Sequence, residues 1–167
     1  MIKKCCIILI TLLTSVCVCF AGQFKVTRVT DGDTIKVTGD GSNITIRLVG
    51  IDAPETSKKK NEPGQPFSQK STKYLASLVL NKVVDLKSYG TGRYGRTLGV
   101  VFVNGKNVNL AMVQVGLAEV YRGRQEKGLD LESYRKAEKE ARDVGRGMWS
   151  LEDAYISPRE WRRGKRK

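Results

Sequence analysis

The residues of this chain best suited to chemistry are carboxylates and arginines that recur in short motifs within its first hundred positions. The carboxylates are Asp31, Asp33, Asp52 and Glu55, and the arginines are Arg47 and Arg96. Carboxylate oxygens bind hard cations such as Ca²⁺ and Mg²⁺, and a guanidinium group can bind two phosphate oxygens at once. Because the sequence has no histidine, a proton acceptor here must be a carboxylate or a metal-bound hydroxide. Such a set could cleave a phosphodiester bond.

The first acidic motif, residues 31–33, has the sequence Asp-Gly-Asp. It does not continue as an EF-hand calcium loop, because Lys36 stands where that loop needs glycine and Ser42 where it needs glutamate. In a strand that begins at Asp33, alternation places this side chain on the same side as Ile35, toward the interior of the fold. The alternative is an ordinary turn, in which aspartate and glycine are common.

The second acidic motif follows an apolar strand and holds Asp52 and Glu55 on either side of Pro54. The proline restricts the backbone and so presets the angle between the two carboxylates, although a turn or a helix start would explain the same residues. Arg47 alternates with the apolar residues of its strand, so it points to their opposite face. Both Arg47 and Arg96 could also be ordinary surface arginines.

A glycine-rich stretch, residues 90–95, matches the pattern of a dinucleotide-binding loop. A strand and not a helix follows it, so this interpretation fails its structural test. The stretch is instead a bend that presents Arg93, Tyr94 and Arg96.

The secondary structure that must position these residues is mainly β. Alternating apolar residues and glycine turns predict strands at 24–30, 33–38, 43–49, 83–87 and 97–103, and helical spacing predicts helices at 67–80, at 108–115 and from Asp130 onward. Asn104-Gly105 predicts a turn after the last strand. Five short strands with a helix inserted after the third favour an α+β, mainly β domain: a five-stranded Greek-key barrel of the OB type with three helices.

The first 21 residues have the features of a secretory signal. Lys3 and Lys4 precede an apolar run at 5–20, and Ala21 is the small residue preferred at a cleavage site. Retention as a membrane anchor is the alternative. All four cysteines lie at positions 5, 6, 17 and 19, so we expect a mature domain from residue 22 without disulfides. If this signal is removed, we expect a secreted or periplasmic protein without stable membrane association.

The remaining chain is strongly basic, since removing Lys3 and Lys4 from the net charge of +13 leaves +11 for residues 22–167. This charge favours a polyanionic partner but does not by itself distinguish nucleic acid from an anionic lipid or polysaccharide. The tail at 151–167 has six basic residues within 157–167 and no apolar period. Disorder is the favoured prediction for it, and a specific binding arm is the alternative.

The order of the motifs resembles the staphylococcal nuclease, or thermonuclease, family over about residues 24–150. The matching motifs are DGDT from Asp31, RLVGIDAPET from Arg47, RYGR from Arg93, GLA from Gly116 and GMWS from Gly147. Each motif is weak alone, but the ordered set is specific. The resemblance implies an OB barrel with three helices, in agreement with the elements above.

The resemblance also implies a role for each candidate residue. Asp33 and Asp52 would bind Ca²⁺, in preference to Mg²⁺, with the backbone carbonyl of Ala53, and Asp31 would support them. Glu55 would position or deprotonate the attacking water, and Arg47 and Arg96 would bind the phosphate. Tyr94 and Tyr121 would line the nucleotide pocket, and we add Arg93 to the substrate-binding residues.

We predict a monomeric nuclease that cleaves single-stranded or locally opened DNA and RNA, and the resemblance further implies products with 3′-phosphate ends. A non-catalytic OB module that binds nucleic acid is the main alternative, and it would gain from basic and aromatic residues. It would gain nothing from carboxylates facing a phosphate. A basic protein docked on an anionic cell surface would explain the charge but not the acids.

Overall fold

The computed structural model of the chain describes residues 22–39, 41–57, 59 and 61–164. The expected secretory segment at 1–21 lies outside these ranges. None of the helices in the described ranges combines the length and the apolar character that a membrane span needs.

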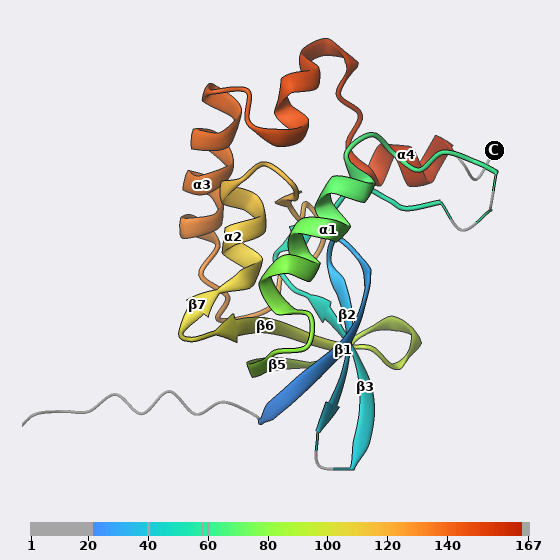
Figure 1. Cartoon of the computed structure of the whole chain (residues 1–167). Helices are drawn as coiled ribbons and strands as arrows, with labels where there is room; N and C mark the ends of the chain where they lie inside the picture. Colours follow the sequence, from blue (N-terminus) through green and yellow to red (C-terminus); the bar gives the residue numbers. More distant parts are fainter. Residues whose placement is uncertain (1–21, 40, 58, 60, 165–167) are drawn as a thin grey trace, which may run out of the picture.

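Five strands form a closed barrel, as the sequence predicts (Figure 1). They are β1 (Gln23–Asp31), β2 (Thr34–Gly39), β3 (Ser42–Leu48), β5 (Val83–Thr91) and β6 (Thr97–Val103). They pair in the order β3-β2-β1-β5-β6, and β3 also pairs with β6. The closing β3–β6 pair is parallel, whereas the other pairs of the barrel are antiparallel. This topology agrees with the OB-type barrel.

The helices gather toward one end of the barrel (Figure 1). They are α1 (Ser68–Val79), α2 (Val108–Gln114), α3 (Leu131–Asp143) and α4 (Pro158–Gly164), and the short 3₁₀ segments are η1 (Arg93–Gly95) and η2 (Gly147–Ala154). The first three confirm the predicted helices within two residues at each predicted boundary. The expected number of three is wrong for the described residues, because α4 adds a fourth α-helix.

Three short strands lie outside the predictions. β7 (Lys106–Asn107) pairs with β6, and β4 (Ile51–Asp52) pairs with β8 (Glu119–Val120) as a separate two-stranded unit. The turn before β7 contains Asn104 and Gly105, both with positive φ, as the Asn-Gly pair predicts. The β4–β8 pair is too short to leave a periodic signal in the sequence.

The apolar face of each strand packs into one core with α1, α2 and α3. Its fully buried side chains include Val26, Ile35, Val37, Ile46, Leu48, Leu75, Leu86, Val101 and Met112. The parallel closure is held by a buried polar residue, Asn109 on α2. Its Nδ2 donates to the carbonyl oxygens of Val49 at 2.9 Å and Gly99 at 3.1 Å, and its Oδ1 accepts from Val101 N at 3.1 Å. One side chain therefore satisfies backbone groups on both sides of the closure.

The basic tail differs from the predicted disorder as far as Gly164. Ser157 and Glu160 form a capping box at the start of α4, since the Ser157 nitrogen donates to Glu160 Oε2 at 3.2 Å and the Glu160 nitrogen to Ser157 Oγ at 3.2 Å. Pro158 occupies the first helical position, which suits its fixed φ. The Ser-Pro-Arg-Glu sequence thus carried a local helix signal that the absence of an apolar period obscured.

Candidate active site

The first carboxylate of the site, Asp33, lies in the turn between β1 and β2. It is buried, and its Oδ2 accepts a hydrogen bond from the Ala53 nitrogen at 3.0 Å. Gly32 allows this close approach, because a Cβ atom there would lie 2.0 Å from Ser71 Oγ on α1 and 2.6 Å from the Ala53 Cβ. The glycine of the Asp-Gly-Asp motif therefore brings the turn against the second acidic segment.

The second carboxylate, Asp52, lies on β4 and is 1% exposed. Its backbone pairs with Glu119 on β8, which is also buried. Burial raises the pKa of Glu119, and the nearby negative charge of Asp52 contributes to that rise. The short β4–β8 pair therefore gathers two buried acids at the end of the barrel.

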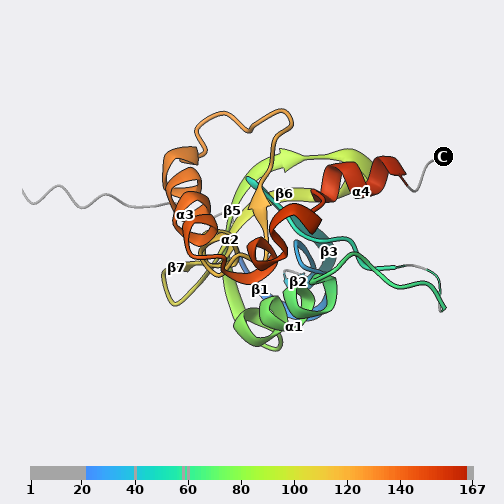
Figure 2. The ribbon, with the colours of Figure 1, turned by 90° about the horizontal axis from the view of Figure 1, so that it is seen from above.

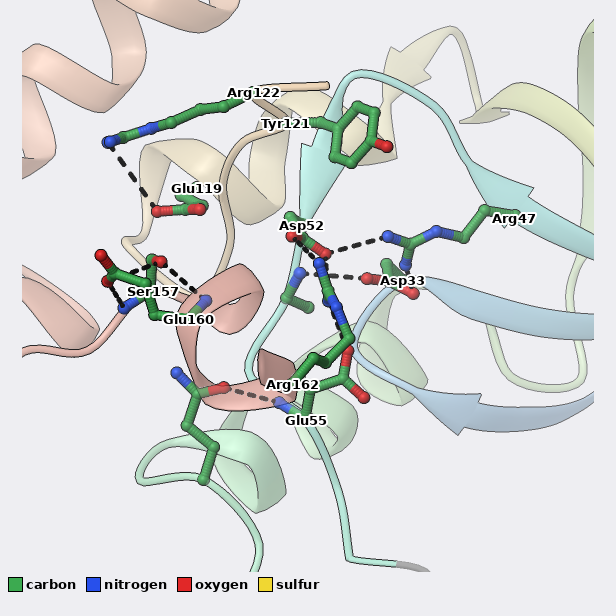
Figure 3. A network of polar contacts seen from close by, with 12 residues as sticks. Asp33, Arg47, Asp52, Glu55, Glu119, Tyr121, Arg122, Ser157, Glu160 and Arg162 are labelled. Atoms are coloured by element: carbon green, nitrogen blue, oxygen red, sulfur yellow. Dashed lines mark hydrogen bonds and ion pairs between the residues drawn. The ribbon is translucent and has the colours of Figure 1, made fainter. Parts of the chain in front are cut away.

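Arg47 connects the two aspartates. It faces Thr34 in the β2–β3 register, and its guanidinium contacts Asp33 through Nη1 and donates from Nη2 to Asp52 Oδ1 at 3.0 Å (Figure 3). Burial lowers the pKa of Arg47, while the charges of Asp52 and Asp31 raise it. Arg47 thus supplies a positive counter-charge to both buried carboxylates.

Asp31 lies beside this group without contacting Arg47. Its Oδ1 accepts from the Asp33 nitrogen at 3.1 Å, which holds the turn in shape. Burial raises the pKa of Asp31, and the charges of Arg47 and Arg96 oppose that rise. The position suits a residue that supports Asp33.

Glu55 follows β4 and is about one-third exposed (36%). Its backbone nitrogen donates to the side-chain oxygen of Gln65 at 3.0 Å, and its carbonyl accepts from the Gln65 nitrogen at 2.8 Å. Two hydrogen bonds to one residue, itself buried, therefore fix the backbone that carries Glu55. Sequence reasoning missed Gln65, because it lies in a segment without an apolar period.

Arg162 on α4 is the largest addition to the predicted site. Its Nη1 and Nη2 donate to the two oxygens of Asp52 at 2.9 and 2.7 Å, and Nη1 also donates to Glu55 Oε1 at 2.5 Å (Figure 3). The hydrogen bond with Asp52 raises the pKa of Arg162. Sequence reasoning counted Arg162 only as part of a basic tail, because no local pattern connects it with residues more than a hundred positions away.

The remaining predicted residues lie around this network. Arg96 stands directly before β6, and its charge acts on both Asp31 and Arg47. Its guanidinium carbon lies 5.9 Å from the ring centre of Tyr94, which is 92% exposed. Arg93 is also exposed, and in the view of Figure 3 the ring of Tyr121 is drawn above Asp52 and Arg47. Arg93 and Tyr94 are thus exposed to solvent, whereas Arg96 is the residue of this stretch whose charge acts on the acidic group.

The donor set agrees with a hard divalent cation. Among the described residues, no group of three or more acidic, histidine or cysteine side chains has the arrangement of a metal site. Asp33 and Asp52 nevertheless supply two buried carboxylates, and oxygen donors are those that Ca²⁺ and Mg²⁺ prefer. The guanidinium groups of Arg47 and Arg162 hold these carboxylates as positive counter-charges.

The amino-acid sequence is similar to a known protein family and to several known proteins. The model of the family described as "Staphylococcal nuclease homologue" matches residues 45–151. An uncharacterized endonuclease of Haemophilus influenzae is 37% identical over 94% of this chain and 82% of its own. A micrococcal nuclease of Shigella flexneri is 39% identical over 83% of this chain and 79% of its own. A protein of Escherichia coli named ParB is 41% identical over 83% and 78% of the two chains.

Proposed function

This chain belongs to the staphylococcal nuclease family, and so to hydrolases that act on nucleic acids, and we propose that it is an exported, Ca²⁺-dependent nuclease without sugar specificity. Its substrates would be single-stranded or locally opened DNA and RNA, and its products would end in 3′-phosphate. Mg²⁺ is the less favoured ion. We further propose that residues 1–21 are a secretory signal, that 22–150 form the nuclease domain with 151–167 as its basic tail, and that the protein acts as a monomer.

One observation carries this proposal: two buried aspartates share one arginine beside a third, partly exposed carboxylate. Asp33 and Asp52 both contact Arg47, and Glu55 is linked to Asp52 through Arg162. Burying carboxylates costs several kcal/mol per ion unless they are compensated. A module that only binds nucleic acid would be better served without them, because they repel phosphate.

In the proposed mechanism, Asp33 and Asp52 would hold the cation, and the Ala53 carbonyl would be a further ligand. When bound, the cation offsets the negative charge that develops on the phosphate. Arg47 and Arg96 bind phosphate oxygens and orient the scissile bond. Glu55 accepts the proton of the attacking water, and its one-third exposure leaves it accessible to that water. Tyr94, Tyr121 and Arg93 contact the neighbouring nucleotide.

The test measures cleavage of end-labelled single-stranded DNA and RNA by the purified protein with Ca²⁺, with Mg²⁺ and with a chelator. Glu55→Gln should lower the rate by about 100- to 10,000-fold, the range typical of a lost general base. Glu140→Gln is the matched control, because it makes the same change on an exposed position of α3. End analysis of the products tests for 3′-phosphate.

Three outcomes would contradict the proposal in different ways. Undiminished cleavage in chelator would exclude the role of the cation, and undiminished cleavage by Glu55→Gln would exclude the role of Glu55. Binding of nucleic acid without any cleavage would favour the alternative, a non-catalytic OB module.

A further inference from the structure

The C-terminal helix α4 is anchored to the site by contacts that precede it. The Tyr155 hydroxyl donates to Glu119 Oε2 at 2.5 Å, and the side-chain nitrogen of Gln65 donates to the Ile156 carbonyl at 2.7 Å. Tyr155 also packs against Trp149, with ring centres 4.6 Å apart. Figure 2 shows α4 beside the loop that follows β4. The helix therefore starts from a fixed point next to the acids.

From this point α4 directs Arg162 onto the carboxylates. The planar guanidinium binds both oxygens of Asp52 and one oxygen of Glu55. Such forked, charge-assisted pairs are among the strongest polar contacts in proteins. The Arg162 side chain is 32% exposed, so it lies at the edge of the site and has solvent to move into.

The atoms that Arg162 occupies are those on which the proposed function depends. Asp52 is an expected ligand of the cation, and Glu55 is the expected proton acceptor. Asp52 Oδ1 accepts from both Arg47 and Arg162, and Oδ2 accepts from Arg162. A divalent cation on these oxygens would therefore compete with Arg162 for the remaining lone pairs and would be repelled by its charge. Glu55 bound to a guanidinium is also less available to accept a proton.

We propose that α4 is an autoinhibitory element in which Arg162 takes the place of the divalent cation, and that binding of the cation releases Arg162 and loosens α4. This inference rests on the proposed cation site at Asp33 and Asp52. The cation affinity of the intact protein is then reduced by the fraction of molecules in which Arg162 is engaged. At low concentrations of divalent cation, the tail thereby holds the nuclease in the inhibited state in which Arg162 binds Asp52 and Glu55.

The first measurement is the affinity for Ca²⁺ by titration calorimetry without nucleic acid. Arg162→Gln should bind Ca²⁺ about tenfold more tightly than the unmodified protein, because competition is removed. Arg162→Lys should fall between the two, because a lysine keeps the charge but not the fork. Arg159→Gln is the control, since it makes the same charge change at an exposed position of the same helix.

The second measurement follows amide hydrogen exchange in α4, residues 158–164, of the unmodified protein. Addition of Ca²⁺ should speed exchange in this segment, whereas in Arg162→Gln exchange should be fast already and respond little to Ca²⁺. Circular dichroism of each variant establishes that it is folded.

Equal Ca²⁺ affinities for Arg162→Gln and the unmodified protein would overturn the inference, as would slower or unchanged exchange in α4 on adding Ca²⁺. A loss of cleavage by Arg162→Gln at saturating Ca²⁺ would also overturn it, because Arg162 would then act on the substrate. If one of these outcomes is found but Ca²⁺ still binds and supports cleavage, only the autoinhibitory role of α4 is overturned and the proposed function is retained. If neither the unmodified protein nor Arg162→Gln binds Ca²⁺, both proposals fail.

Discussion

Gln65 fixes the position of Glu55 through its side-chain oxygen, which accepts a hydrogen bond from the Glu55 nitrogen at 3.0 Å. The other end of the same amide group donates to the Ile156 carbonyl. One buried side chain thus joins the loop that bears Glu55 to the segment before α4.

Replacing Gln65 with methionine keeps the side-chain length but removes both hydrogen bonds. We expect the free energy of unfolding to fall by about 1 to 3 kcal/mol, since each lost bond leaves a backbone group unpaired. The kcat for cleavage should fall by about tenfold or more, because the backbone that positions Glu55 loses a hydrogen bond. The KM should change little, because no contact with the substrate is removed. Steady-state kinetics with urea unfolding tests this, and an unchanged kcat would show that Gln65 only stabilises the fold.

Arg47 is expected to stabilise the fold as well as to bind phosphate. Arg47→Met leaves Asp33 and Asp52 without this counter-charge, and breaking a buried ion pair from one side costs about 3 to 5 kcal/mol. We expect the free energy of unfolding to fall by about 3 kcal/mol or less, because the Arg47 side chain is 17% exposed and the ion pairs are not fully buried. Urea unfolding at neutral pH measures it. The double variant with Asp33→Asn should recover part of the loss, and purely additive effects would argue against the pairing.

Gly32 is expected to tolerate no side chain. Gly32→Ala would bring a Cβ to 2.0 Å from Ser71 Oγ, so the turn or α1 must move, and overpacking of this kind costs about 1 to 3 kcal/mol. Because Asp33 follows directly, cleavage should fall as well. Gly164→Ala is the control, since its Cβ would meet no atom within 4 Å. Thermal unfolding compares the two variants, and equal melting temperatures would contradict the close packing.

Glu119 should make the stability depend on pH. Its folded pKa is raised by burial above the ordinary value of 4.5, so its stabilising contribution is complete below pH 4.5 and is lost as the pH rises through the raised value. Glu119→Gln removes this titration and keeps an acceptor for the Tyr155 hydroxyl. The variant should therefore gain stability relative to the unmodified protein between pH 4 and 7. Urea unfolding across this range measures the difference, and a pH-independent difference would exclude the raised pKa.

The barrel and the first three helices could be predicted because their signals are local. Alternation of apolar residues marks β1, β2, β3, β5 and β6, and Asn104-Gly105 marks the turn after β6. The β4–β8 pair could not be predicted in the same way, because two residues on each side carry no period. This pair matters for the candidate site, since it brings Asp52 and Glu119 together.

The sequence alone determined which groups are available for chemistry: the acids in two motifs, the arginines that accompany them and the absence of histidine. Their order also pointed to the family. Only the tertiary structure decided that Arg47 joins Asp33 to Asp52, that Gln65 supports Glu55 and that Arg162 lies on Asp52. The last pair is separated by 110 positions. A contact over such a distance leaves no periodic trace in the chain, because it depends on how the barrel, the loop and α4 pack together.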